Sequence, residues 1–146
     1  MEHLSTGTLL NCSGIKVEAA KAFKNRKIIA YYFSASWCGP CKQLLPKMKA
    51  IYKENKSRKS GLEIIFVSSD TAAPEMLKYF QERHGGWYAV PFEDSGGEIL
   101  RQIYNITFIP QIIVTKDDGT IISREGTKDV EELGIDVLKA WNPSSI

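Results

Sequence analysis

Two kinds of hydrophobic pattern alternate along the chain. The continuous apolar run at residues 28–33 is typical of a central strand that is covered on both faces, and residues 62–68, apolar except for Glu63 and Ser68, are expected to form a second buried strand. After Cys41 the apolar residues recur at helical spacing instead. They are Leu44, Leu45, Met48, Ile51 and Tyr52. We therefore predict an amphipathic helix that ends near Asn55 and is kinked at Pro46.

Shorter patterned segments complete the predicted fold. Further helices are expected at residues 18–23, 73–83, 97–104 and 130–141. Further strands are expected at residues 8–10, 15–17, 111–115 and 121–123, with extended chain at 87–91. Asp117-Asp118-Gly119 is a favourable hairpin turn between the last two strands. Because strands and helices alternate, we predict an α/β fold, a three-layer sandwich with a mixed central sheet and an N-terminal hairpin.

The size and composition of the chain are those of one globular domain. With 146 residues, 43% hydrophobic and 25% charged, we expect a single domain over residues 1–146, with loose termini at 1–7 and 143–146. Nineteen Lys and Arg against 17 Asp and Glu give a formal charge of +2, too weak to indicate nucleic acid or an anionic membrane as the main partner. No apolar run approaches the ~18 residues of a membrane span. We expect a monomer.

Cysteine usage indicates a reducing compartment. The chain has three cysteines, a sparse and odd number that is unlike the disulfide framework of a secreted protein. Residues 1–7 lack the basic and apolar regions of a secretory signal. We therefore expect the cytoplasm, the nucleus or both, where a close cysteine pair indicates catalysis, redox sensing or metal binding.

The candidate chemistry is carried by Cys38-Gly39-Pro40-Cys41, where the first apolar strand gives way to the amphipathic helix. Spacing of i, i+3 at a helix start places both sulfurs on one side of the first turn, within bridging distance. The free N–H groups and the helix dipole favour a thiolate there and lower the pKa of a cysteine from ~8.5. Pro40 fits a first helical turn, and Gly39 leaves room for the backbone of a partner.

Exposure assigns the two roles. Cys38, at the tip, is expected to attack a substrate disulfide, and Cys41, one turn further in, to resolve the mixed disulfide. The competing use is zinc, which needs four ligands. The other candidate ligands, Cys12, His3 and His84, are scattered, so we expect no metal and no bound cofactor other than the redox-active disulfide itself.

The segment Trp37-Cys38-Gly39-Pro40-Cys41-Lys42 resembles the active site of the thioredoxin superfamily. Pro46 and Ile109-Pro110 stand where that superfamily has its helix-kinking proline and its cis-proline. Within the superfamily, the chain is most similar to the tryparedoxin and nucleoredoxin branch, on the residues of 32–38 and of 87–94. The resemblance covers about residues 8–141.

The resemblance implies a thioredoxin-like fold and a function. Pro110 is expected to be cis and to pack opposite the sulfurs, and Ile109 to offer its backbone to an extended substrate. The implied activity is reduction of protein disulfides, with electrons from an NADPH-dependent reductase or a low-molecular-weight, glutathione-like thiol. A redox-sensitive binding module of nucleoredoxin type, which grips a signalling partner, is the alternative.

The chain departs from the family pattern at two points. The tryparedoxin-like branch usually has two prolines between its cysteines, whereas this chain has Gly39-Pro40, as in thioredoxin itself. Thioredoxins also place a buried carboxylate where this chain has Tyr32. Because a phenol with a pKa near 10 is a poor base, we expect proton transfer at Cys41 to use water, another side chain or the substrate.

Other polar and aromatic residues receive structural interpretations. Trp37 is expected to form a contact surface beside the thiolate, as aromatic side chains commonly do. The residues expected to pack or to cap are Trp87, Tyr88, Phe92, Cys12 and His84. Asp70 and Arg124 are expected to be solvated residues at strand ends.

Overall fold

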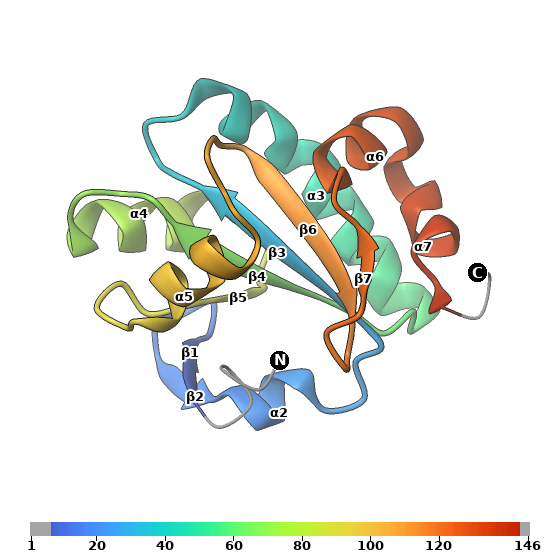
Figure 1. The fold of residues 1–146 in the computed structure, drawn as a ribbon, viewed down its shortest axis with the longest axis horizontal. Coiled ribbons are helices and arrows are strands. Elements are labelled where there is room, and N and C mark those ends of the chain that lie inside the picture. The colour runs from blue at the N-terminus through green and yellow to red at the C-terminus, as the bar shows by residue number, and fades with distance from the viewer. Residues whose placement is uncertain (1–6, 144–146) are drawn as a thin grey trace.

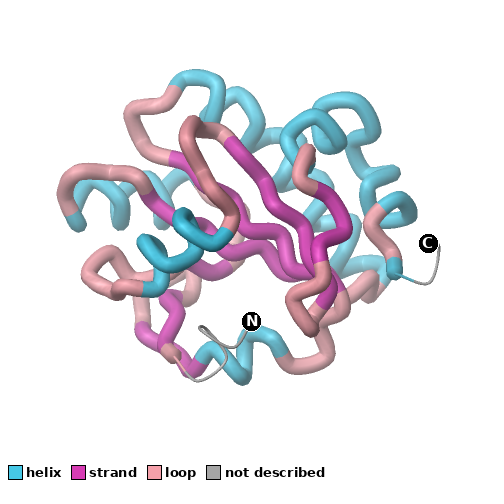
Figure 2. Tube along the Cα trace, in the orientation of Figure 1, coloured by secondary structure: helices cyan, strands magenta, loops and turns pink. Residues whose placement is uncertain are grey.

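A computed structural model describes residues 7–143 of the chain and shows a seven-stranded sheet between two layers of helices (Figures 1 and 2). The strand order is β2-β1-β5-β4-β3-β6-β7. The strands are β1 (Thr8–Leu10), β2 (Lys16–Glu18), β3 (Ile28–Ser34), β4 (Leu62–Ser68), β5 (Tyr88–Ala89), β6 (Gln111–Lys116) and β7 (Ile121–Ser123). The helices are α2 (Ala19–Phe23), α3 (Gly39–Arg58), α4 (Ala73–Arg83), α5 (Gly96–Ile103), α6 (Gly126–Leu133), the 3-10 turn η1 (Gly134–Asp136) and α7 (Val137–Ala140).

The sheet is mixed, as the pattern predicts. The central strand β3 runs parallel to β4 and antiparallel to β6, and β4 runs parallel to β5. Hairpins add antiparallel pairs at the two edges, β1 with β2 and β6 with β7. The predicted three-layer α/β/α architecture is therefore confirmed, with element bounds that mostly agree within one or two residues.

The two faces of the sheet carry separate parts of the core. Alternate side chains of β3, such as Ala30 and Tyr32, pack with α3, α4, α6 and α7. The intervening ones, such as Ile29 and Tyr31, pack with α2 and α5. Because β3 and β4 are covered on both sides, their sequences are mostly apolar instead of alternating. The exception within β4 is the buried Glu63, which accepts hydrogen bonds from Tyr52 Oη and Arg26 Nε.

The predicted C-terminal helix over residues 130–141 is wrong in two respects. The helix begins earlier, at Gly126, and it stops at Leu133, before a 3-10 turn leads into the separate helix α7. Gly134 has a φ of 54°, a left-handed conformation that breaks the helix and that glycine adopts at little cost. Because the apolar residues keep helical spacing on both sides of Gly134, the sequence pattern does not indicate this break.

Helix α3 is longer than predicted and continues through Pro46 to Arg58. It ends at Lys59, which takes a left-handed φ of 53° and donates its N–H to Lys56 O. Within residues 7–143, no helix combines the length and apolar character needed to cross a membrane.

Candidate active site

The cysteine pair lies where β3 passes into α3. Cys38 is the N-cap of α3 and Pro40 lies in its first turn, as expected. Cys38 and Cys41 are joined by a disulfide, with their Cα atoms 5.3 Å apart. The N–H of Cys41 donates to Cys38 Sγ at 3.2 Å, so an otherwise free N–H of the helix end points at this sulfur.

The two cysteine residues differ in exposure in the order that the sequence predicts. Cys38 is 6% exposed and Cys41 is completely buried. Trp37 beside them is 62% exposed, and a Cβ at Gly39 would have no atom within 4 Å. The surface around Cys38 is therefore open on the Gly39 side and apolar on the Trp37 side.

The Ile109–Pro110 peptide bond is cis, as the resemblance implies. Gln111 pairs with Phe33, so Pro110 comes at the same end of the sheet as the loop that leads from β3 to Cys38. Phe108, which sequence reasoning does not single out, is 65% exposed on this loop. Within residues 7–143, the backbone of the half-buried Ile109 makes no hydrogen bond.

A chain of buried hydroxyls lies behind Cys41. Tyr32 Oη donates to the carbonyl oxygen of Cys41 at 2.8 Å and lies 3.4 Å from Tyr79 Oη. Tyr79 Oη lies 2.9 Å from Ser34 Oγ. Burial raises the pKa of the Tyr32 phenol well above its ordinary value. This residue therefore holds the first turn of α3 as a neutral donor and is not a base near pH 7.

Asp70 is not the solvated strand-end residue that the sequence indicates. Only 7% of it is exposed, and it accepts hydrogen bonds from Ser36 N (2.9 Å), Ser36 Oγ (2.5 Å) and Ser68 Oγ (2.7 Å). Because parallel strands β3 and β4 end side by side at Ser34 and Ser68, their following loops meet at one edge of the sheet. Asp70 thereby fixes the loop immediately before Trp37.

His84 is a helix-end residue, as predicted, but it is buried. It follows α4, and its Nδ1 accepts from Trp87 Nε1 at 2.9 Å among the rings of Phe66, Tyr79 and Phe80. Burial lowers the pKa of His84 from 6.5 to about 3. The imidazole is therefore neutral at physiological pH and packs with Trp87, whose predicted core position is confirmed.

The remaining sequence candidates lie apart from the disulfide or at its margin. Cys12 is an exposed free cysteine between β1 and β2, at the opposite edge of the sheet from β6 and β7. Arg124 is exposed and Tyr88 is partly buried. Phe92 is exposed, so the prediction that it packs in the interior is wrong. His3 lies outside the described residues. Residues 7–143 bring together no group of three or more His, Cys, Asp or Glu suited to a metal ion.

Comparison with known proteins agrees with this geometry. A family model described as Thioredoxin-like matches residues 25–121. Nucleoredoxin from Bos taurus is 34% identical over 125 residues, a match that takes in 85% of this chain and 28% of that protein. Probable nucleoredoxin 1 from Arabidopsis thaliana is 36% identical over 111 residues, which are 75% of this chain and 19% of that protein. The chain therefore spans less than a third of the length of these curated relatives.

Solved structures extend the likeness to the whole described fold. Thioredoxin related protein 16 of Carcinoscorpius rotundicauda is 37% identical, with a TM-score of 0.83 over 97% of this chain and 99% of that one. Its structure is described together with a role in regulating NF-kB activity. Tryparedoxin II complexed with glutathionylspermidine is 27% identical, with a TM-score of 0.78 over 88% of both chains.

The sheet order, the disulfide at the start of α3 and these matches together define the class: the chain belongs to the thioredoxin-like family. Within that superfamily it falls in the tryparedoxin and nucleoredoxin branch. The family and its paired cysteines support a thiol–disulfide oxidoreductase.

Proposed function

We propose that this protein reduces the disulfides of other proteins, with Cys38 as the attacking thiolate and Cys41 as the resolving thiol. The observation that carries the proposal is the placement of the pair at the start of α3. Cys38 is the more exposed of the two cysteines, and its Sγ accepts a hydrogen bond from the N–H of Cys41. A thiolate at such a position is stabilised by the helix end and is nucleophilic at neutral pH.

The proposed cycle has two exchange steps. The Cys38 thiolate attacks one sulfur of a substrate disulfide, forms a mixed disulfide and releases the other substrate sulfur as a thiolate. Cys41, as a thiolate, then attacks Cys38 Sγ, releases the second substrate thiolate and forms the Cys38–Cys41 disulfide. The substrate gains two electrons and takes up two protons from solution, and the protein loses two electrons.

Substrate binding is proposed at the surface beside Cys38. Trp37 and Phe108 offer exposed apolar contacts, and the unpaired backbone of Ile109 can pair with an extended segment, with Pro110 next to it. Main-chain pairing tolerates many side chains. This surface therefore suits protein substrates of varied sequence.

The electron donor is proposed to be an NADPH-dependent reductase or a low-molecular-weight thiol of glutathione type. The complex of tryparedoxin II with glutathionylspermidine supports the thiol. The Gly39-Pro40 pair, as in thioredoxin, supports the reductase. Turnover with NADPH and thioredoxin reductase, compared with NADPH, glutathione reductase and glutathione, separates the two. We propose that the protein acts as a monomer in the cytoplasm, the nucleus or both.

Insulin reduction tests the proposed activity. We expect turnover by the wild type and loss of at least a hundredfold in Cys38→Ser and in Cys41→Ser. Cys41→Ser should accumulate a mixed disulfide through Cys38, which Cys38→Ser should not form. Cys12→Ser is the matched control and should retain wild-type turnover, since Cys12 lies at the far edge of the sheet. Absence of turnover by the reduced wild type with either donor system would refute the reductase.

A redox-sensitive binding module is the second candidate function. The exposed rings of Trp37, next to Cys38, and of Phe108, on the loop that leads to Pro110, favour it, because such aromatic surfaces are common in protein interfaces. The related C. rotundicauda protein, with its described role in NF-kB regulation, also supports it. This function requires a partner that binds the dithiol and disulfide forms with different affinity and is not itself reduced.

A further inference from the structure

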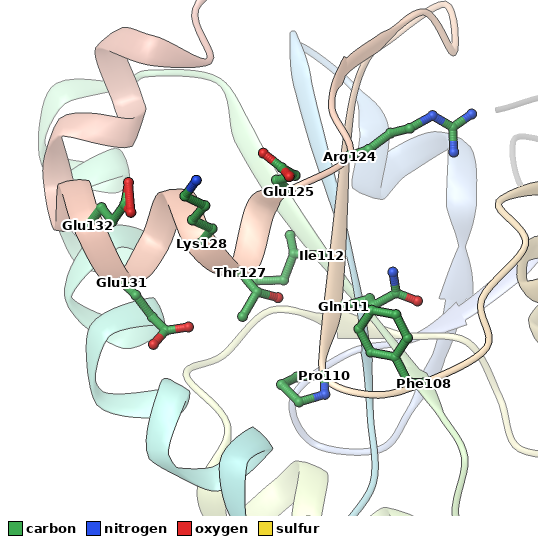
Figure 3. A pocket seen from close by; sticks show the side chains of 10 residues that line it. All are labelled: Phe108, Pro110, Gln111, Ile112, Arg124, Glu125, Thr127, Lys128, Glu131 and Glu132. Atoms are coloured by element: carbon green, nitrogen blue, oxygen red, sulfur yellow. The ribbon is translucent and has the colours of Figure 1, made fainter.

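Two pockets of similar volume lie at opposite ends of the central strand β3. One, of about 370 Å³, lies beside Pro110 between β6 and α6, at the end of β3 that leads to the disulfide, and carboxylates and cations line it together (Figure 3). The other, of about 390 Å³, lies where β3 and β4 begin and α3 ends. We call it the basic pocket. It is lined by Asn25, Arg26, Asn55, Lys56, Lys59 and Gly61.

Hydrogen bonds fix the walls of the basic pocket relative to each other. The N–H groups of Lys27 and Ile28 both donate to Gly61 O, at 2.8 and 3.1 Å, and so join the loop before β3 to the loop before β4. The side chain of Asn55 pairs with both backbone groups of Leu62, at 2.8 and 3.0 Å, and so ties the last turns of α3 to the start of β4. The pocket is therefore built from segments that are far apart in the sequence but held together in the fold.

Two of its cations are held in place by the buried side chains behind them. Arg26 Nε donates to Glu63 Oε2 at 3.1 Å, and the completely buried Glu63 also accepts from Tyr52 Oη at 2.8 Å. Lys56 Nζ lies 5.0 Å from the centroid of the Tyr52 ring, a cation–π contact. Within residues 7–143 the terminal nitrogens of Arg26 make no hydrogen bond or ion pair. The donors of the guanidinium therefore remain available to a ligand.

The charges of the basic pocket favour an anion that carries two negative charges. Three cations line the pocket and no carboxylate does, so that subtraction of Glu63 behind Arg26 leaves a charge of +2. Lys56 and Lys59 make no ion pair within residues 7–143. The end of α3 contributes only about −0.5 of an elementary charge through the helix dipole. The positive side chains therefore outweigh it.

The shape and lining of the pocket narrow the class of ligand. A guanidinium with free terminal nitrogens suits the paired oxygens of a phosphate group, and lysines add to the attraction as point charges. The volume of about 390 Å³ is in the range of small-molecule sites. No aromatic or aliphatic side chain is among the six lining residues, so a nucleobase would find no ring to stack on. The exposed carboxamide of Asn25 can donate to and accept from hydroxyl groups.

We propose that the basic pocket binds a small sugar phosphate. Arg26, Lys56 and Lys59 contact the phosphate group, and Asn25 contacts the hydroxyl groups of the sugar. The site is separate from the disulfide, which lies at the opposite end of α3 (Figure 1). It does not depend on the exchange of sulfurs.

Isothermal titration of the oxidised protein with glucose 6-phosphate at low ionic strength tests the site. We expect saturable binding at one site per chain that weakens as salt is added, because the pocket is open to solvent. Inorganic phosphate and AMP should bind at least about fivefold more weakly, and glucose should not bind, since each lacks part of the recognised group. The double variant Lys56→Gln/Lys59→Gln should lower the affinity at least about tenfold through the loss of two charged contacts.

A matched double variant separates specific contacts from the overall charge. Lys47→Gln/Lys139→Gln removes the same charge from exposed lysines outside the pocket and should keep the wild-type affinity within about twofold. Both double variants should unfold at the same denaturant concentration as wild type, since the lysines are exposed. Absence of saturable binding, or an equal loss of affinity in the two double variants, would overturn the site. Equal or tighter binding of AMP, of inorganic phosphate or of a phosphoserine peptide would overturn the sugar phosphate as its ligand.

Discussion

His84 illustrates at the scale of a single residue how burial changes the chemistry of a side chain. The imidazole accepts a hydrogen bond from Trp87 and is surrounded by aromatic rings, and its pKa falls from 6.5 to about 3. In the unfolded chain the same group binds a proton below about pH 6.5. The folded state therefore loses stability as the pH falls from about 6.5 towards 3, because only the unfolded state gains the proton.

A His84→Asn variant tests this linkage, since its side-chain oxygen can still accept from Trp87 and does not titrate. We expect wild type to lose up to about 1.4 kcal/mol per pH unit more than the variant below pH 6. Urea unfolding at pH 7.5, 6, 5 and 4 measures the difference. Other titrating groups, including the buried Glu63, whose pKa burial raises, are common to both proteins and cancel. Parallel stability curves would contradict a buried neutral His84.

At the scale of elements, helix α6 owes its position to the absence of a side chain at Gly126. A Cβ there would lie 2.6 Å from Cβ, Cγ2 and the carbonyl oxygen of Ile112 on β6. Gly126→Ala should therefore cost about 1–3 kcal/mol of unfolding free energy by forcing α6 away from the sheet. Gly97→Ala is the control, because its Cβ would make only ordinary contacts in α5, and we expect it to be neutral or stabilising by up to about 1 kcal/mol. Denaturant unfolding of both variants measures the contrast.

The elements also show what the sequence can and cannot predict. Local chemistry decides the start of α3, because Pro40 sacrifices no helix hydrogen bond in a first turn and Cys38 precedes it, and this start is confirmed. The start of α6 depends instead on the contact between Gly126 and Ile112, which no local pattern contains. Asp70 is likewise misjudged, since its partner Ser36 lies 34 residues away and approaches only because β3 and β4 are neighbours. Cys38 and Cys41 can be identified without knowing the fold, because their spacing in the sequence already indicates a redox-active pair.

At the scale of the whole molecule, the N-terminal hairpin pairs with the other strands of the sheet over a short stretch only, yet we expect it to unfold together with the rest of the domain. β1 pairs with β5 only at Leu10 and Ala89, but Leu9 is completely buried in the core on the α2 and α5 side. Leu9→Ala should lower the free energy of unfolding by about 2–5 kcal/mol, because it leaves a cavity in the core. Ile15→Ala in the same hairpin is the control. The Ile15 side chain is 61% exposed, so this change should alter the free energy of unfolding by less than about 0.5 kcal/mol. Circular dichroism and the fluorescence of the tryptophans should report one coincident transition in both variants. An early transition that Leu9→Ala shifts while the main one stays fixed would show instead that the hairpin is a separate unit.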